Sequence, residues 1–131
     1  MIVVDASVLV TGLADDTADG DSARQRLRGE RIAAPHLIDV EVVSAWRRMV
    51  SAGTLDERRA QLAMDDLLAL RMQRVSHLRL IQRCWQLCAN LTAYDAAYVA
   101  LAERLGATLV TADVRLTNAP GPRCQIEVLT A

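Results

Sequence analysis

Short apolar runs that end at turn residues alternate along this chain with longer segments of helical periodicity. The runs indicate strands at residues 2–4, 32–34, 72–75, 107–111 and 126–129, the third of them the least marked. The longer segments indicate helices at residues 6–13, 20–29, 37–52, 55–70, 78–89 and 93–105. Strands that alternate with helices in this way are typical of an α/β domain built on a parallel sheet.

The length of the chain allows one compact domain, residues 1–131. Of the 131 residues, 52% are hydrophobic, and a chain of this size folds without a disulfide. Cys84, Cys88 and Cys124 lack zinc-site spacing and are expected to be buried thiols. No apolar stretch approaches the ~18 residues of a membrane span. Asp5 interrupts the only apolar segment that could resemble a signal peptide, so we expect a cytoplasmic protein without a membrane segment.

The charged residues narrow the chemistry. All 15 basic residues are arginines, which excludes a P-loop, a Schiff base and lysine-assisted phosphoaspartate sites. Residues 1–21 contain five acids and no base, although the net charge of the whole chain is only −1. This division suits an acidic pocket beside arginine-bearing faces, as expected for a polyanion bound through a metal.

Four carboxylates lie among apolar residues, and we expect none of them to have a basic partner nearby in sequence. They are Asp5, Glu41, Asp95 and Asp113. An ionised carboxylate that is buried without a partner costs several kcal/mol or more. Asp5 and Asp113 follow expected strands, and the carboxyl ends of parallel strands form the edge where ligands bind. One shared divalent cation would satisfy all four carboxylates.

Oxygen ligands without His or Cys favour Mg²⁺, with Mn²⁺ as a possible substitute, over Zn²⁺. Ser7 and Thr111 each lie two residues from one of the acids. We expect their hydroxyls to support those carboxylates or a metal-bound water.

Structural roles remain open for three of these acids. Asp95 and Thr92 fit a helix capping box, and Asp113 fits a turn or cap. Glu41 could lie on the polar edge of its helix, and Asp39 is its nearest rival for a place in the site.

Three segments together resemble one known family. VVDASVLV, PHLIDVEVVSAWRR, and LTAYDAAYVALAERLGATLVTAD with the following Leu116 are similar to the PIN-domain ribonucleases, and more narrowly to VapC-type toxins. The resemblance implies a three-layer α/β/α fold with about five parallel strands in the order 3-2-1-4-5. It also implies that the four carboxylates are the family's catalytic, metal-binding acids, and that Ser7 and Thr111 are its small hydroxyl positions.

The resemblance further implies an activity and partners. The chain would be a Mg²⁺-dependent endoribonuclease, acting as the toxin of a toxin–antitoxin pair and inhibiting translation and growth. It would form a homodimer and bind a cognate antitoxin protein. Arg24, Arg26, Arg28, Arg47 and Arg48 are candidates for contacts to RNA phosphates. The alternative is a non-catalytic PIN-like module that binds RNA or protein, but four facing carboxylates would be of no use to it.

Overall fold

The computed structural model describes residues 1–130 and contains one five-stranded parallel sheet. The strand order is β3-β2-β1-β4-β5, as the family resemblance predicts. The strands are β1 (Ile2–Val4), β2 (Ile32–Pro35), β3 (Gln73–Val75), β4 (Thr108–Thr111) and β5 (Ile126–Val128). All three residues of β1 are buried, which accounts for its continuous apolar sequence in the centre of the sheet.

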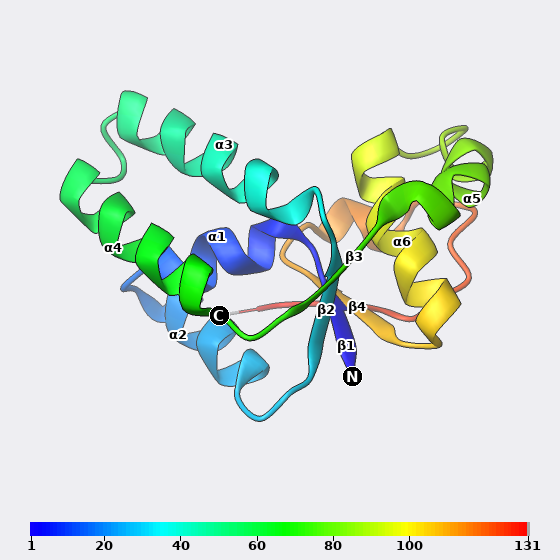
Figure 1. Cartoon of the computed structure of the whole chain (residues 1–131), viewed down its shortest axis with the longest axis horizontal. Coiled ribbons are helices and arrows are strands. Elements are labelled where there is room, and N and C mark those ends of the chain that lie inside the picture. The colour runs from blue at the N-terminus through cyan, green and yellow to red at the C-terminus, as the bar shows by residue number, and fades with distance from the viewer. Residues whose placement is uncertain (131) are drawn as a thin grey trace.

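Helices cover both faces of the sheet and give the expected three layers (Figure 1). They are α1 (Ala6–Ala14), α2 (Ala18–Leu27), α3 (Ile38–Ser51), α4 (Glu57–Ala69), α5 (Ile81–Leu87) and α6 (Ala93–Leu105). Two 3₁₀ turns, η1 (His77–Leu80) and η2 (Val114–Thr117), complete the fold. Helices α1 to α4 lie on one side, where α3 and α4 project as a helical pair, and α5 with α6 lies on the other (Figure 1).

Helix α6 packs against the centre of the sheet. It contacts β1, β2 and β4 as well as α5, and every residue from 96 to 102 is buried. The spacing of its large apolar residues predicts a single stripe made of Tyr94, Tyr98, Leu101 and Leu105. That prediction is partly wrong: Tyr98 and Leu101 are buried, but Tyr94 is 63% exposed and Leu105 39% exposed. The alanines of this helix allow close approach on nearly all sides, so its buried surface is wider than one stripe.

Two expected helices differ in detail. The helix predicted at 78–89 is divided into η1 and the shorter α5, because Ser76 caps a 3₁₀ turn through the backbone N–H of Leu78. The polar helix predicted at 20–29 lies two residues earlier and ends before Gly29, whose φ of 77° is a left-handed conformation. Neither change affects the sheet.

Within residues 1–130, the longest helices are too short or too polar to cross a bilayer.

Candidate active site

The four predicted acids are distributed over the ends of two strands and the first turns of two helices. Asp5 follows β1, and Asp113 lies two residues beyond β4. The two strands are neighbours with Val4 opposite Val110, and the Asp5 N–H donates to the Val110 carbonyl at 3.3 Å. Helices α3 and α6 bring in the other two acids near their first turns. The charge of Asp95 raises the pKa of Asp5 and of Glu41, and the charge of Asp113 raises the pKa of Asp95. The four acids are therefore linked electrostatically at one edge of the sheet.

Asp5 is buried, with 5% of the residue exposed, and is held by two hydroxyls. Ser7 Oγ donates to one carboxylate oxygen and Thr111 Oγ1 to the other. Both hydroxyls are themselves fixed, because Ser7 accepts from the Ala112 N–H at 2.9 Å and Thr111 from the Asp113 N–H at 3.0 Å. Burial nevertheless raises the pKa of Asp5, and the nearby charge of Asp95 adds to that rise. Ser7 thus supports the acid two residues before it, as expected, whereas Thr111 supports the carboxylate of Asp5 and not that of Asp113.

Glu41 accepts a hydrogen bond from the hydroxyl of Tyr98 on α6. Burial raises the pKa of Glu41, and the charges of Asp95 and Asp5 raise it further. The rival carboxylate, Asp39, is held elsewhere by Arg74 through two hydrogen bonds of 2.7 and 2.9 Å. The structure therefore directs Glu41, and not Asp39, toward the other acids.

Asp95 has both of the features that its sequence suggested. The Thr92 hydroxyl caps α6 by accepting the Asp95 N–H at 3.1 Å. The side chain is half-buried, and burial together with the charge of Asp113 raises its pKa. A capping role for Thr92 is thus compatible with a place for the Asp95 carboxylate in the acidic cluster.

Asp113, unlike the other three acids, has a basic partner, contrary to the sequence prediction. The guanidinium of Arg115, two residues later, binds both of its oxygens and holds the pKa of Asp113 below its usual value. Asp113 also caps η2 by accepting the Arg115 N–H at 3.0 Å. The predicted cap is confirmed, and the prediction of an unpaired carboxylate is wrong here because the partner follows in the adjoining turn.

The donor chemistry of the cluster suits a hard divalent cation, although its side chains are not yet arranged around one. Among residues 1–130, no three His, Cys, Asp or Glu side chains are grouped closely enough to hold a metal ion. Asp113 is turned to Arg115 and would have to reorient, whereas Glu41 engages only one of its oxygens, with Tyr98. Carboxylate oxygens are the ligands that Mg²⁺ and Mn²⁺ prefer, and raised carboxylate pKa values mark the excess negative charge that a cation would relieve.

Two of the arginines considered for RNA contacts instead hold the fold together. Arg24 donates to the carbonyls of Gly12 and Asp15 at 3.0 and 2.8 Å. Arg26 pairs with Glu127 on β5 and with Glu30. Their guanidinium groups are therefore engaged within the protein.

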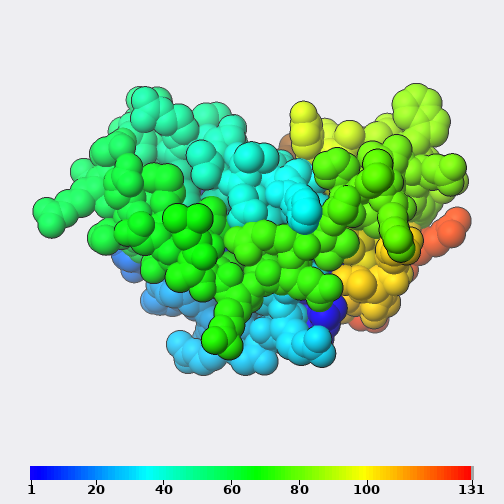
Figure 2. All heavy atoms as spheres, viewed as in Figure 1, coloured from blue at the N-terminus to red at the C-terminus, as the bar shows by residue number. Residues whose placement is uncertain are grey.

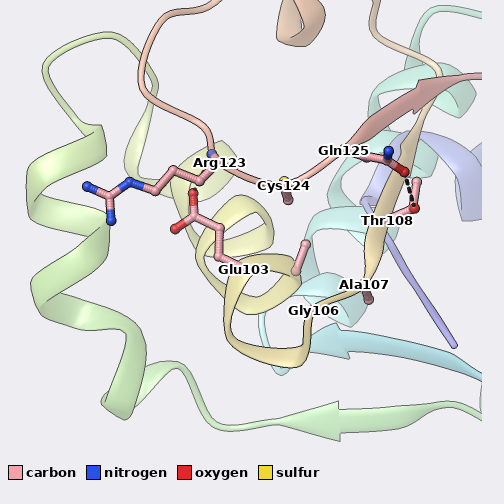
Figure 3. Close-up of a pocket in the computed structure, with 8 residues that line it drawn as sticks. Glu103, Gly106, Ala107, Thr108, Arg123, Cys124 and Gln125 are labelled. Atoms are coloured by element: carbon pink, nitrogen blue, oxygen red, sulfur yellow. Dashed lines mark hydrogen bonds between the residues drawn. The ribbon is translucent and has the colours of Figure 1, made fainter.

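A cavity of about 440 Å³ lies at the opposite edge of the sheet (Figure 3). Gly106, Ala107 and Thr108 line it where β4 begins, across from Gln125 just before β5. None of the four acids belongs to it. In the space-filling view, the outline of the molecule dips between the α3–α4 pair and the α5–α6 side (Figure 2). Charge and burial, not cavity size, identify the candidate site.

The three cysteines are free thiols, with Cys84 buried and Cys88 and Cys124 partly buried.

Comparison with known proteins places the chain in a family. The PIN domain family model matches residues 2–122. The chain belongs to the PIN-domain family. It is 41% identical to Ribonuclease VapC9 of Mycobacterium tuberculosis over 98% of both chains. It is 44% identical to Ribonuclease VapC1 of the same species, over 97% of this chain and 96% of the relative. These similarities place it among the VapC proteins of the family.

Solved structures agree on the PIN-domain architecture. The crystal structure of PAE2754 from Pyrobaculum aerophilum is 25% identical, with a TM-score of 0.69 over 97% of this chain and 83% of that one. VapBC2 from Rickettsia felis, bound to a DNA fragment from its promoter, is 17% identical, with a TM-score of 0.67 over 99% and 100% of the two chains. At this low identity, the similarity to VapBC2 concerns the fold alone.

Two residues of the site were not singled out by the sequence. From the sequence, Tyr98 is predicted only to belong to the apolar stripe of its helix. It lies three residues after Asp95, however, and this spacing places both side chains on one face of the helix. Arg115 is two residues from Asp113, and that spacing was the available signal.

Proposed function

We propose that this PIN-domain protein is a Mg²⁺-dependent endoribonuclease that hydrolyses RNA phosphodiester bonds. The observation that carries the proposal is the environment of Asp5: a buried carboxylate with a raised pKa, held by two hydroxyls, at the same sheet edge as three partly buried acids. Carboxylates that repel one another in this way cost stability unless a cation compensates their charge. The relatives named ribonuclease support RNA as the substrate.

Asp5, Asp95 and Asp113 would hold the cation directly or through water, and Glu41 would bind a second ion, orient the water or act as a base. The bound cation would polarise the scissile phosphate and lower the pKa of a water molecule.

The remaining residues of the cluster keep its carboxylates oriented. Ser7 and Thr111 each donate to a different oxygen of Asp5, which fixes the plane of that carboxylate. The Tyr98 hydroxyl holds one oxygen of Glu41 through a single hydrogen bond. Preorganised carboxylates lose little freedom when a cation or substrate binds, which is an advantage for catalysis.

We also propose that the protein acts as the toxin of a toxin–antitoxin pair in the cytoplasm, inhibiting translation and growth by cleaving RNA. Its VapC relatives and the fold it shares with a toxin–antitoxin complex from Klebsiella pneumoniae support this role. In this proposal it assembles as a homodimer and binds an antitoxin protein. Light scattering of the isolated protein tests the homodimer, and light scattering of the protein mixed with a candidate antitoxin protein tests the hetero-oligomer.

The test of the activity is incubation of the purified protein with total RNA. We expect cleavage with Mg²⁺ or Mn²⁺, none with EDTA, and none from Asp5→Asn. A non-catalytic binding module would retain the RNA uncut under all of these conditions, and that result would overturn the proposal.

A further inference from the structure

One arginine lies directly on the acidic cluster. The Arg115 guanidinium donates two hydrogen bonds to the Asp113 carboxylate. Nε lies 3.0 Å from one carboxylate oxygen, and Nη2 lies 2.8 Å from the other. Of the ion pairs formed by residues 1–130, only this one includes any of the four candidate acids. The positive charge of Arg115 also acts on Asp95, where it opposes the rise in pKa. Arg115 therefore occupies part of the space in which a cation would be held.

The two side chains of this ion pair differ in exposure and in the contacts that anchor them. The Asp113 side chain is 27% exposed and is anchored by capping η2, whereas the Arg115 side chain is 87% exposed. Among the described ion pairs, no other arginine side chain is as exposed. An exposed ion pair is weak and is screened by salt, so a competing charge displaces it at little cost. The guanidinium can leave while the backbone of η2 stays in place.

We infer that Arg115 exchanges partners: it neutralises Asp113 in the empty site, and it binds a phosphate of the RNA once Asp113 has turned away from it. The planar guanidinium matches two phosphate oxygens as well as it matches two carboxylate oxygens. Its position beside the acids would place that phosphate next to the scissile one. The inference rests on the proposed function for the identity of the polyanion, RNA.

The exchange can be tested without a metal, because Asp113→Asn releases Arg115 by itself. The measurement is fluorescence anisotropy of a fluorescein-labelled single-stranded RNA of about 20 nucleotides, in EDTA, with wild type, Asp113→Asn, Arg115→Ala and the double variant. We expect Asp113→Asn to bind several-fold more tightly than wild type. Arg115→Ala should weaken binding several-fold in the Asp113→Asn background but less than twofold in the wild-type background.

Salt dependence adds a second readout. In the Asp113→Asn background, Arg115→Ala should make the slope of log K against log salt shallower by about 0.7, the value for one phosphate contact on a single strand. Arg104→Ala is the matched control, because Arg104 is an exposed arginine in the last turn of α6, at the far end from Asp95. Circular dichroism confirms that each variant is folded.

Equal losses from Arg115→Ala in both backgrounds, or equal effects of Arg115→Ala and Arg104→Ala, would overturn the inference. The outcome is separable from that of the proposed function. If the protein cleaves RNA but Arg115 shows no dependence on Asp113, only the exchange fails. If the binding pattern is found but no RNA is cut, the exchange stands and the nuclease proposal fails.

Discussion

The hydroxyl of Tyr98 donates a hydrogen bond to the carboxylate of Glu41, linking two residues that are 57 positions apart in the chain. Tyr98 is 1% exposed, so the donor is shielded from water, while the Glu41 side chain that accepts is partly buried. Burial and the adjacent carboxylate raise the pKa of the tyrosine, which keeps its proton available for donation. The link ties α3 to α6 across the acidic cluster and fixes one of its four carboxylates.

Tyr98→Phe removes this donor and leaves the ring in place. We expect RNA cleavage to fall by roughly tenfold in kcat with little change in KM, because a misplaced Glu41 affects the chemical step more than RNA binding. Loss of one hydrogen bond to a charged group should lower the free energy of unfolding by about 1–2 kcal/mol. Tyr94→Phe is the control, since Tyr94 is largely exposed on the same helix and should behave as wild type in both assays.

The raised carboxylate pKa values predict how stability depends on pH without metal. For Asp5, with an ordinary value of 3.8 and a higher one in the fold, the native state binds the proton more tightly than the unfolded state. The free energy of unfolding is then highest below the ordinary value and falls as pH rises through the folded pKa. Asp113 acts in the opposite direction, because its pKa is lowered and its contribution is lost in acid.

Asp5→Asn isolates the contribution of one group. The measurement is urea unfolding of wild type and Asp5→Asn in EDTA, from about pH 4 to about pH 8. Relative to wild type, the free energy of unfolding of the variant should increase as pH rises, by about 1 kcal/mol or more at the upper end. A difference that stays constant over this range, or that favours wild type increasingly at high pH, would show that the Asp5 carboxylate is not destabilised by its surroundings.

Divalent cations should stabilise the folded protein. A cation bound only by the native state adds ~1.4 kcal/mol for each tenfold excess over its Kd, which is about 3–5 °C in Tm for a domain of this size. Differential scanning fluorimetry with Mg²⁺ or Mn²⁺ should show this shift for wild type and a much smaller one for Asp5→Asn and Asp95→Asn. Equal shifts in all three proteins would place the bound cation elsewhere.

The sequence was sufficient to predict the sheet and the position of its acidic edge. Buried strands have nearly continuous apolar sequences, and β1 and β4 each lead into an acid, so Asp5 and Asp113 could be placed side by side once the strand order was known. Even the weak strand predicted at residues 72–75 is present, as β3 at residues 73–75. The strands and the acids that follow them are local patterns that a single chain displays, whereas the strand order was predicted from the family resemblance.

The partners of the acids could not be predicted in the same way. Glu41 was distinguished from Asp39 only by contacts with Tyr98 and Arg74, which lie far away in sequence. The width of the buried surface of α6 depends on how closely its alanines approach the sheet. The spacing of apolar residues in the sequence does not predict that distance. Arg115 is close in sequence, but whether its side chain turns toward Asp113 or toward solvent is a property of the folded turn.

The central claim is that this cluster of acids hydrolyses RNA with a divalent cation, and mapping the ends of the cleaved RNA tests it most directly. His36 and His77 lie before different helices and offer no evident acid–base pair to activate the 2′-hydroxyl of the RNA. Attack by water with departure of the 3′-oxygen leaves a 5′-phosphate and a 3′-hydroxyl. We predict these ends from wild type with Mg²⁺, and no cleavage with EDTA or from folded Asp5→Asn. Ends with a 2′,3′-cyclic phosphate, or undiminished cleavage by Asp5→Asn, would contradict the account.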